Sequence, residues 1–193
     1  MKEKMNAVES ANMSLASIAG LGEAAQAEGV YTFKCFEYEG GPLLWEQTID
    51  NVVCTLGKNL MLQSSLTGSA YTVTGPYMGL ISSIGYTAVA AGDTMTSHTG
   101  WNEAGSTNAP TFAARIAPSF GTATGGAIST STPVSFTMTG NGTLVGAFIT
   151  YGTGAVTTLM STAGTLLSAG AFVGGNQPVN SGNVVQVTYS LSL

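Results

Sequence analysis

The residues best suited to chemistry are gathered in one polar stretch, AAGDTMTSHTGWNE (90–103). Its reactive or aromatic side chains are Asp93, Ser97, Trp101, Glu103 and the only histidine of the chain, His98. A serine, a histidine and an aspartate can form a hydrolytic triad, but triads are normally assembled from distant segments rather than from near neighbours. We therefore interpret His98 as a structural residue with a local hydrogen bond, Asp93 as a cap and Trp101 as buried.

No cluster of side chains has the spacing of a metal or phosphate site. One histidine and two well-separated cysteines do not provide the ligand set of a zinc site. Lys58 follows a glycine, but a phosphate-binding loop also needs an earlier glycine and a serine or threonine after the lysine. The chain has Val52 and Asn59 at those positions. We expect no metal and no cofactor, and we interpret Lys58 as a solvated helix residue or an interface contact.

Acidic and aromatic side chains around a Gly-Gly-Pro turn offer two further interpretations. Glu37, Glu39 and Glu46 could include the pair of carboxylates that a glycosidase needs, but a solvated hairpin tip is the better interpretation. Trp45 and Trp101 could stack on sugars, although most tryptophans that are at least half-buried serve packing. None of these patterns is specific enough to predict a reaction.

The last two-fifths of the chain contain no group for acid–base chemistry. From Ile116 to Leu193 there is no Asp, Glu, Lys, Arg, His or Cys. General acid–base catalysis needs such groups within hydrogen-bond reach of the reacting atoms. Any site would therefore lie before Ile116, and we expect that the protein is not an enzyme.

The two cysteines, Cys35 and Cys54, lie in successive strand-like runs. They could form a disulfide only if those strands had a suitable register. A reducing cytosol keeps thiols free, and free cysteines are among the most buried residue types. We favour two buried free thiols over a disulfide.

Charged residues are unusually scarce. Asp, Glu, Lys and Arg make up 8% of the 193 residues, against roughly 25% in a typical soluble domain. Such a chain either lies mostly inside an assembly or is a rigid β structure coated with Thr and Ser. The net charge of −5 and the scattered basic residues disfavour direct binding to nucleic acid.

The sequence predicts neither a secretion signal nor a membrane span. The first 29 residues lack a continuous apolar segment and carry Glu3 and Glu9, which is unlike a signal peptide. No run of about 18 apolar residues is present, so we expect no transmembrane helix and no membrane partner.

Residues 1–29 are expected to form an N-terminal arm. Residues 3–19 have weak helical periodicity, and a second helical turn is expected at 23–28 after two glycines. The side chains near one face of the first helix are Met5, Val8, Asn12 or Met13, Leu15, and Ile18 or Ala19. A helix this short is only marginally stable alone. It needs a surface to lie on, either its own domain or a neighbouring subunit.

Residues 30–193 are expected to form an antiparallel β-sandwich, either a jelly roll or an immunoglobulin-like sandwich. Short strand-like runs recur every 8–15 residues or so between Gly, Asn and Pro turns, which is typical of such folds. The predicted strands are 30–39, 43–53, 77–81, 86–89, 111–117, 134–139, 144–150, 166–172 and 184–193.

Helices are predicted at two places in this body. One spans 55–66, and its expected apolar face is Leu56, Leu60, Met61 and Leu66. The other is a turn or short helix running from Gly92 to His98. A tight turn is predicted at 140–142, where the sequence is Gly-Asn-Gly.

Several segments resemble a family of tailed-bacteriophage virion proteins. They are TIDNVVCTLGKNLMLQ (48–63), PYMGLIS (76–82), AAGDTMTSHTGWNE (90–103) and, more loosely, LVGAFIT (144–150) and GTLLSAGAFVGG (164–175). The third segment is the most specific, and the N-terminal arm is not covered. Members of the family are labelled as capsid decoration (cement) proteins or as tail or fibre structural proteins.

The resemblance implies a structural, non-catalytic virion protein. Low charge, many small residues and an N-terminal arm favour a cement role, in which the protein binds the outside of the capsid and stabilises contacts between capsid subunits. The expected partners are the major capsid protein and other copies of this chain, as a dimer or trimer, on virions assembled in the host cytoplasm. The alternative is a tail, head-fibre or adaptor protein that could bind a host surface or glycan, although the repeats or heptad stems common in fibres are missing.

Overall fold

The computed structural model describes residues 27–67 and 74–193. The predicted N-terminal arm lies outside these residues, apart from its last three positions. Glu28 and Gly29, expected in the arm, already belong to the first strand. In the described part of the chain, no helix has the length and apolar character needed to cross a membrane.

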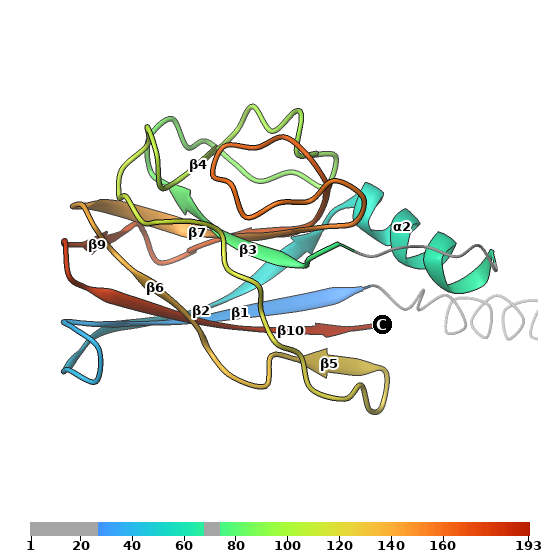
Figure 1. The fold of residues 1–193 in the computed structure, drawn as a ribbon, viewed down its shortest axis with the longest axis horizontal. Helices are drawn as coiled ribbons and strands as arrows, with labels where there is room; N and C mark the ends of the chain where they lie inside the picture. The colour runs from blue at the N-terminus through green and yellow to red at the C-terminus, as the bar shows by residue number, and fades with distance from the viewer. Residues whose placement is uncertain (1–26, 68–73) are drawn as a thin grey trace, which may run out of the picture.

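The described residues form ten strands and one helix (Figure 1). The strands are β1 (Glu28–Phe36), β2 (Leu43–Val53), β3 (Tyr77–Ser82), β4 (Asn102–Glu103), β5 (Ala127–Ser129), β6 (Val134–Thr137), β7 (Gly142–Tyr151), β8 (Thr165–Ala171), β9 (Gln177–Val179) and β10 (Val184–Ser192). The helix is α2 (Thr55–Leu66). The bounds of β2 and α2 are those predicted from the sequence.

Two layers of antiparallel strands face each other, which confirms the predicted sandwich (Figure 1). In one layer β1 lies between β2 and β10, and β5 and β6 also pair with β10. In the other, β7 lies between β3 and β8, with β4 on β3 and β9 on β7. Strand β2 joins the layers, because Val52 and Val53 at its end pair with β8.

Alternating side chains of β1 and β10 form one wall of the core. Tyr31 is paired with Tyr189 and Phe33 with Val187, and all four side chains are buried. Strands β3 and β7 supply the facing wall with Met78, Leu80, Ala147 and Ile149. The predicted alternation of the last strand is therefore confirmed, since its apolar positions point into the core and its polar positions do not.

Two predicted strands are wrong. At 86–89 the chain is irregular, because Thr87 and Ala88 donate their N–H groups to the carbonyl of Gly100 in the polar stretch rather than to a sheet. At 111–117 the backbone bonds go to several partners, and only Ile116 forms a bridge to the sheet, at Met78. Both segments contain apolar residues, which led to the strand prediction. Neither segment has a continuous neighbouring strand with which to form a ladder.

The short strands β4, β5 and β9 were not predicted, since two or three residues show no periodicity. Pro178 in β9 is tolerated because β9 pairs only with β7. The tight turn predicted at 140–142 is a bend at 139–140, and Gly142 already belongs to β7. It makes no hairpin, because β6 and β7 pair with different strands.

The predicted apolar face of α2 is only half right. Leu60 and Met61 pack against the core, whereas Leu56 and Leu66 are exposed. The helix meets β8 through Gly57, where an added Cβ would lie 2.8 Å from the Cα of Leu167. Since this glycine sets the side of α2 that faces the sheet, the leucines on either flank turn outward.

Gly146 in β7 is a close-packing position that gives a test of this architecture. An added Cβ would collide with the carbonyl of Gly170 and lie 2.9 Å from the Cα of Ala171 in β8. We expect Gly146→Ala to lower the free energy of unfolding by about 1–3 kcal/mol in urea denaturation, because backbone must move. The control is Gly92→Ala, where an added Cβ meets nothing within 4 Å and the change should stay below about 0.5 kcal/mol. Equal losses in the two variants would contradict this packing.

Candidate functional site

The polar stretch 90–103 forms a series of turns that ends in β4. Of the two structures predicted for 92–98, the turn is present and the short helix is not. The Oγ1 of Thr94 accepts the Ser97 N–H at 2.9 Å, and a carboxylate oxygen of Asp93 accepts the Ala90 N–H at 2.9 Å. Thr94 is therefore the residue that caps the following turn, and the cap predicted for Asp93 is wrong, because Ala90 precedes the segment.

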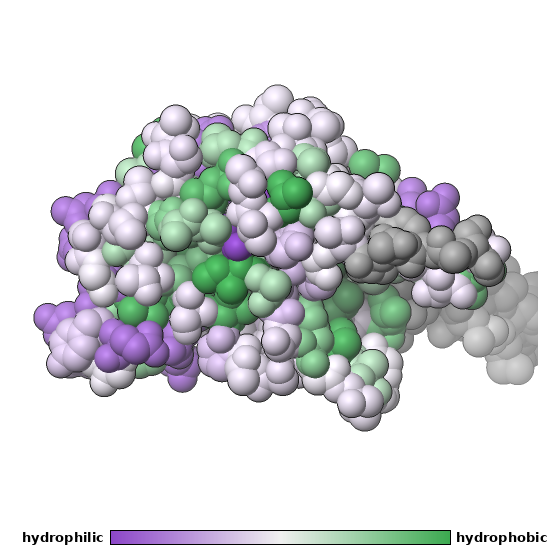
Figure 2. All heavy atoms as spheres, in the orientation of Figure 1, coloured by the Kyte–Doolittle hydropathy of each residue, from purple (hydrophilic) through white to green (hydrophobic). Residues whose placement is uncertain are grey.

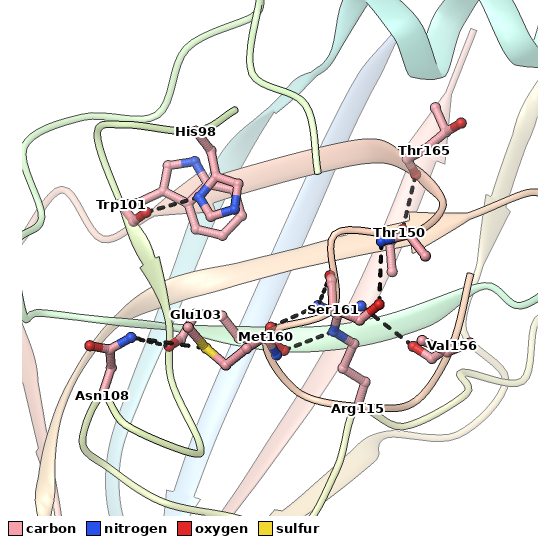
Figure 3. Close-up of polar contacts among 11 residues, drawn as sticks. His98, Trp101, Glu103, Asn108, Arg115, Thr150, Val156, Met160, Ser161 and Thr165 are labelled. Atoms are coloured by element: carbon pink, nitrogen blue, oxygen red, sulfur yellow. Dashed lines mark hydrogen bonds and ion pairs between the residues drawn. The ribbon is translucent and has the colours of Figure 1, made fainter. Parts of the chain in front are cut away.

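Trp101 is the centre of this stretch and is almost fully buried. Its indole N–H donates to the Asp93 carboxylate at 2.9 Å. The His98 ring stacks on the indole with 3.9 Å between centroids (Figure 3), and Phe148 of β7 contacts it at 5.2 Å. The structure thus brings Asp93, His98 and Trp101 together around one indole, as predicted for a packing element.

The histidine has a defined hydrogen-bonding role. Its Nδ1 lies 2.9 Å from the backbone carbonyl of Trp101, and since a carbonyl only accepts, Nδ1 carries a proton. In a triad that N–H would donate to the Asp93 carboxylate, and the other ring nitrogen would accept from the Ser97 hydroxyl. Asp93 binds the indole instead, and the described contacts include none that joins His98 to either residue. The structural interpretation of His98 is confirmed.

A buried ion pair beside this cluster was not predicted. The Arg115 Nε lies 2.8 Å from Oε1 of Glu103, and an Arg115 terminal nitrogen lies 2.7 Å from Oε2 (Figure 3). The two side chains are 0% and 4% exposed. This two-pronged geometry is the strong form of the interaction. It joins β4 to the segment that bridges β3 next to Arg115.

The same ion pair holds the β7–β8 loop. The carbonyl of Ser161 accepts from Arg115 at 2.7 Å, and the Met160 N–H donates to Glu103 Oε2 at 2.7 Å. Met160 has a φ of 62°, a left-handed conformation that costs a non-glycine residue roughly 1–2 kcal/mol. We infer that the contact with Glu103 offsets this cost and keeps the loop in place.

A local signal in the sequence could have indicated this pair. Arg115 is the last charged residue of the chain and lies in the apolar context TFAARIAPSF. A guanidinium in such a context needs an anion when it is buried. The acids of the chain are few, but the choice of Glu103 depends on the fold, since it is the contact with β3 that places both residues on one side of the sheet.

A cavity of about 200 Å³ lies between the Trp101 cluster and the ion pair. Its walls include Met95, His98, Phe148 and Met160, together with the paired Glu103 and Arg115. The charged atoms on its wall already bind one another or the loop, so they are not available as an acid or base. Among the titratable side chains on this wall, only His98 keeps a ring nitrogen, Nε2, without a hydrogen bond. The arrangement can therefore hold segments together, but it offers no second free group to assist that nitrogen in a proton transfer.

The remaining candidates lie apart from this cluster. Glu37, Glu39 and Glu46 are exposed around the β1–β2 turn, as expected for a solvated hairpin tip. Trp45 is half-buried, with its ring edge on Phe172 and its N–H on the carbonyl of Pro178. Trp101, with one face on His98 and almost no exposed area, has no surface to offer a sugar.

The cysteines are free and buried, which confirms the predicted thiols. Burial raises the pKa of Cys35 to about 11. Burial, with a smaller contribution from the negative charge of Asp93, raises the pKa of Cys54 to about 12. Lys58 is partly buried on α2. Across residues 27–67 and 74–193, no group of three His, Cys, Asp or Glu side chains could hold a metal ion.

The ion pair makes Arg115 a sensitive position. We expect Arg115→Met to lower the free energy of unfolding by about 3–5 kcal/mol, because it leaves a buried carboxylate without its partner. The matched control is Lys34→Met, since the Lys34–Glu46 pair is 3.5 Å long and nearly half-exposed. Loss of this exposed pair should lower the free energy of unfolding by at most about 1 kcal/mol. Chemical denaturation of both variants checks this, and similar losses would contradict a special role for the buried pair.

The buried thiols and tyrosine predict a loss of stability in alkali. Burial also raises the pKa of Tyr31, and all three groups lose protons more readily when the chain unfolds. Stability should therefore be complete below pH 9, the ordinary thiol value, and fall as the pH rises toward 11 and 12. The urea midpoint measured from pH 8 to 11 checks this. The Cys35→Ala/Cys54→Ala variant should show a shallower decline, and a decline that is unchanged would exclude the thiols as a cause.

Comparisons with known proteins assign no family to the chain. No protein-family model, curated protein or solved structure matches it. What the protein does is therefore inferred from its residues, its surface and the contacts within its fold.

Proposed function

We propose that this protein is a structural component of a tailed-bacteriophage virion, where it binds the outside of the capsid and stabilises contacts between capsid subunits. The observation that carries the proposal is a rigid β-sandwich with a surface poor in charge and rich in apolar side chains. The resemblance of segments 48–63, 76–82 and 90–103 to virion proteins supports the same class.

The surface is suited to a protein that lies within an assembly. The described residues include ten charged side chains, and two of these, Glu103 and Arg115, are buried, which leaves eight. Eleven large apolar side chains are exposed on the same residues. Figure 2 shows a mostly pale, weakly polar face with hydrophobic patches. A protein that stays free in solution normally covers itself with charge, so this surface is suited to lasting contacts.

The interior supports a passive role. His98, Asp93, Glu103 and Arg115 each bind a partner inside the fold. A cement protein has to resist the pressure of packaged DNA, and it does so through rigid packing rather than through chemistry. The proposed partners are the major capsid protein and further copies of this chain, on the capsid surface of virions assembled in the host cytoplasm.

The proposal is tested by copy number and by rebinding. Quantitative mass spectrometry of purified virions should find hundreds of copies, and purified protein should saturate capsids that lack it. A count of a few tens or fewer would instead place the protein in the tail or a fibre, and no copies would exclude a virion role.

Salt provides a second readout of the same interaction. Because the surface has few charges, the occupancy of capsids should change less than about twofold between roughly 50 and 500 mM NaCl, over which surface charges become strongly screened. Cosedimentation at each salt concentration measures the occupancy. A steep loss of binding with salt would mean that charges, rather than apolar contacts, hold the protein on its partner.

A further inference from the structure

An apolar groove of about 490 Å³ lies at the end of the sandwich where α2 and the C-terminus meet. Its lining includes Ala27, Lys58, Met61, Leu62, Leu66 and Leu193. Leu62, Leu66 and Leu193 are 57%, 77% and 70% exposed. Three leucines left this open around one hollow form a patch that a partner would be expected to cover.

The described chain begins inside this groove. Ala27, its first residue, lines the groove and also packs against the core. Figure 1 shows the start of β1, the C-terminus and α2 at the same end of the molecule. The 26 residues that precede Ala27 are therefore attached directly to the wall of the groove. No other candidate occupant of the groove has such an attachment.

The sequence of those residues suits the groove. Met5, Val8, Leu15 and Ile18 lie near one helical face at about 100° per residue. Glu3, Glu9 and Glu23 only slightly outnumber Lys2 and Lys4 among residues 1–26, and the one charged side chain on the described groove wall is Lys58. The complementarity is therefore mainly that of an apolar stripe for an apolar hollow.

The length of the connection allows the segment to reach the groove of its own chain. Seven residues, 20–26, separate the apolar stripe from Ala27, and when extended they span up to roughly 23 Å. The twelve-residue helix α2 is about 18 Å long. A short tether also gives a high effective concentration, which favours the chain's own segment over one from another copy.

We propose that residues 3–19 dock in the groove between α2 and Leu193 of the same chain, with the Met5–Ile18 stripe against the exposed leucines. Of the two surfaces that the arm could use, its own domain or a neighbouring subunit, this selects its own domain. The inference does not depend on the virion proposal.

Cysteine cross-linking in the full chain tests the docking. Leu15→Cys is combined with Ser65→Cys, which lies on the groove wall, while the native cysteines are buried. Mild oxidation at micromolar concentration should give an intramolecular disulfide, seen as a monomer that has lost two thiols. Leu15→Cys with Glu39→Cys, at the opposite end of the sandwich, should give none. A cross-linked dimer would overturn the proposal in favour of a second copy, and no cross-link would overturn it as well.

Proteolysis provides a readout that does not use cysteines. A glutamyl endopeptidase should cut after Glu9 about tenfold faster in Leu62→Ser/Leu66→Ser than in the parent chain, because cleavage follows the population of the undocked segment. The control is Leu43→Ser/Leu44→Ser, two leucines exposed beside the β1–β2 turn, which should leave the rate unchanged. Circular dichroism verifies that both variants fold. Equal rates in all three proteins would overturn the proposal.

Discussion

The buried ion pair between Glu103 and Arg115 is the contact on which the loop side of the sandwich depends. Removing two charges from water costs several kcal/mol per ion, and attraction repays this only with good geometry and further hydrogen bonds. Both conditions are met, because the pair is two-pronged and its remaining atoms bind Met160 and Ser161. The pair is formed only when β4, the segment at Arg115 and the β7–β8 loop are all in place. We infer that its main effect is to select this one arrangement of loops.

Phe148 connects the ion pair to the aromatic cluster. Its ring lies 5.3 Å from the guanidinium carbon of Arg115 and 5.2 Å from the Trp101 ring. Gly79 in the neighbouring strand leaves the space that this ring occupies, since an added Cβ would lie 2.5 Å from it. The residues of the polar stretch that were candidates for catalysis, Asp93, His98 and Trp101, thus pack together beside Phe148 of β7. Their polarity serves hydrogen bonds within the fold, since Asp93 binds the Trp101 indole and His98 binds the Trp101 carbonyl.

The local sequence pattern predicted the long strands and the helix well, and it predicted the irregular segments poorly. The bounds of β2 and α2 were predicted to the residue, and β7, β8 and β10 to within two. Strand β10 alternates buried and less buried residues, and β7 and β8 are continuous runs of small and apolar residues next to glycines. The local hydrogen bond of His98 was predictable because its partner lies three residues away, whereas the bond from the Trp101 indole to Asp93 was not predicted. The segments 86–89 and 111–117 have apolar residues without strand partners, and no local signal reveals that. The partner of Arg115 depends on strand pairing across the sheet, which sequence spacing does not encode.

Six of the eleven exposed large apolar side chains lie in two sets, one on α2 and at the C-terminus and one at the β1–β2 turn. Figure 1 shows these two places at opposite ends of the sandwich. Leu62, Leu66 and Leu193 surround the groove where the described chain begins, and Tyr38, Leu43 and Leu44 flank the β1–β2 turn. A segment of the same chain can reach only the first set, so an intramolecular occupant there leaves the second set open to another molecule. Glu37, Glu39 and Glu46 are exposed around the same turn, so a contact there would pack apolar side chains inside a rim of carboxylates, and its lifetime would depend on slow dissociation of the packed part. Such a contact suits a protein that joins an assembly once and stays there.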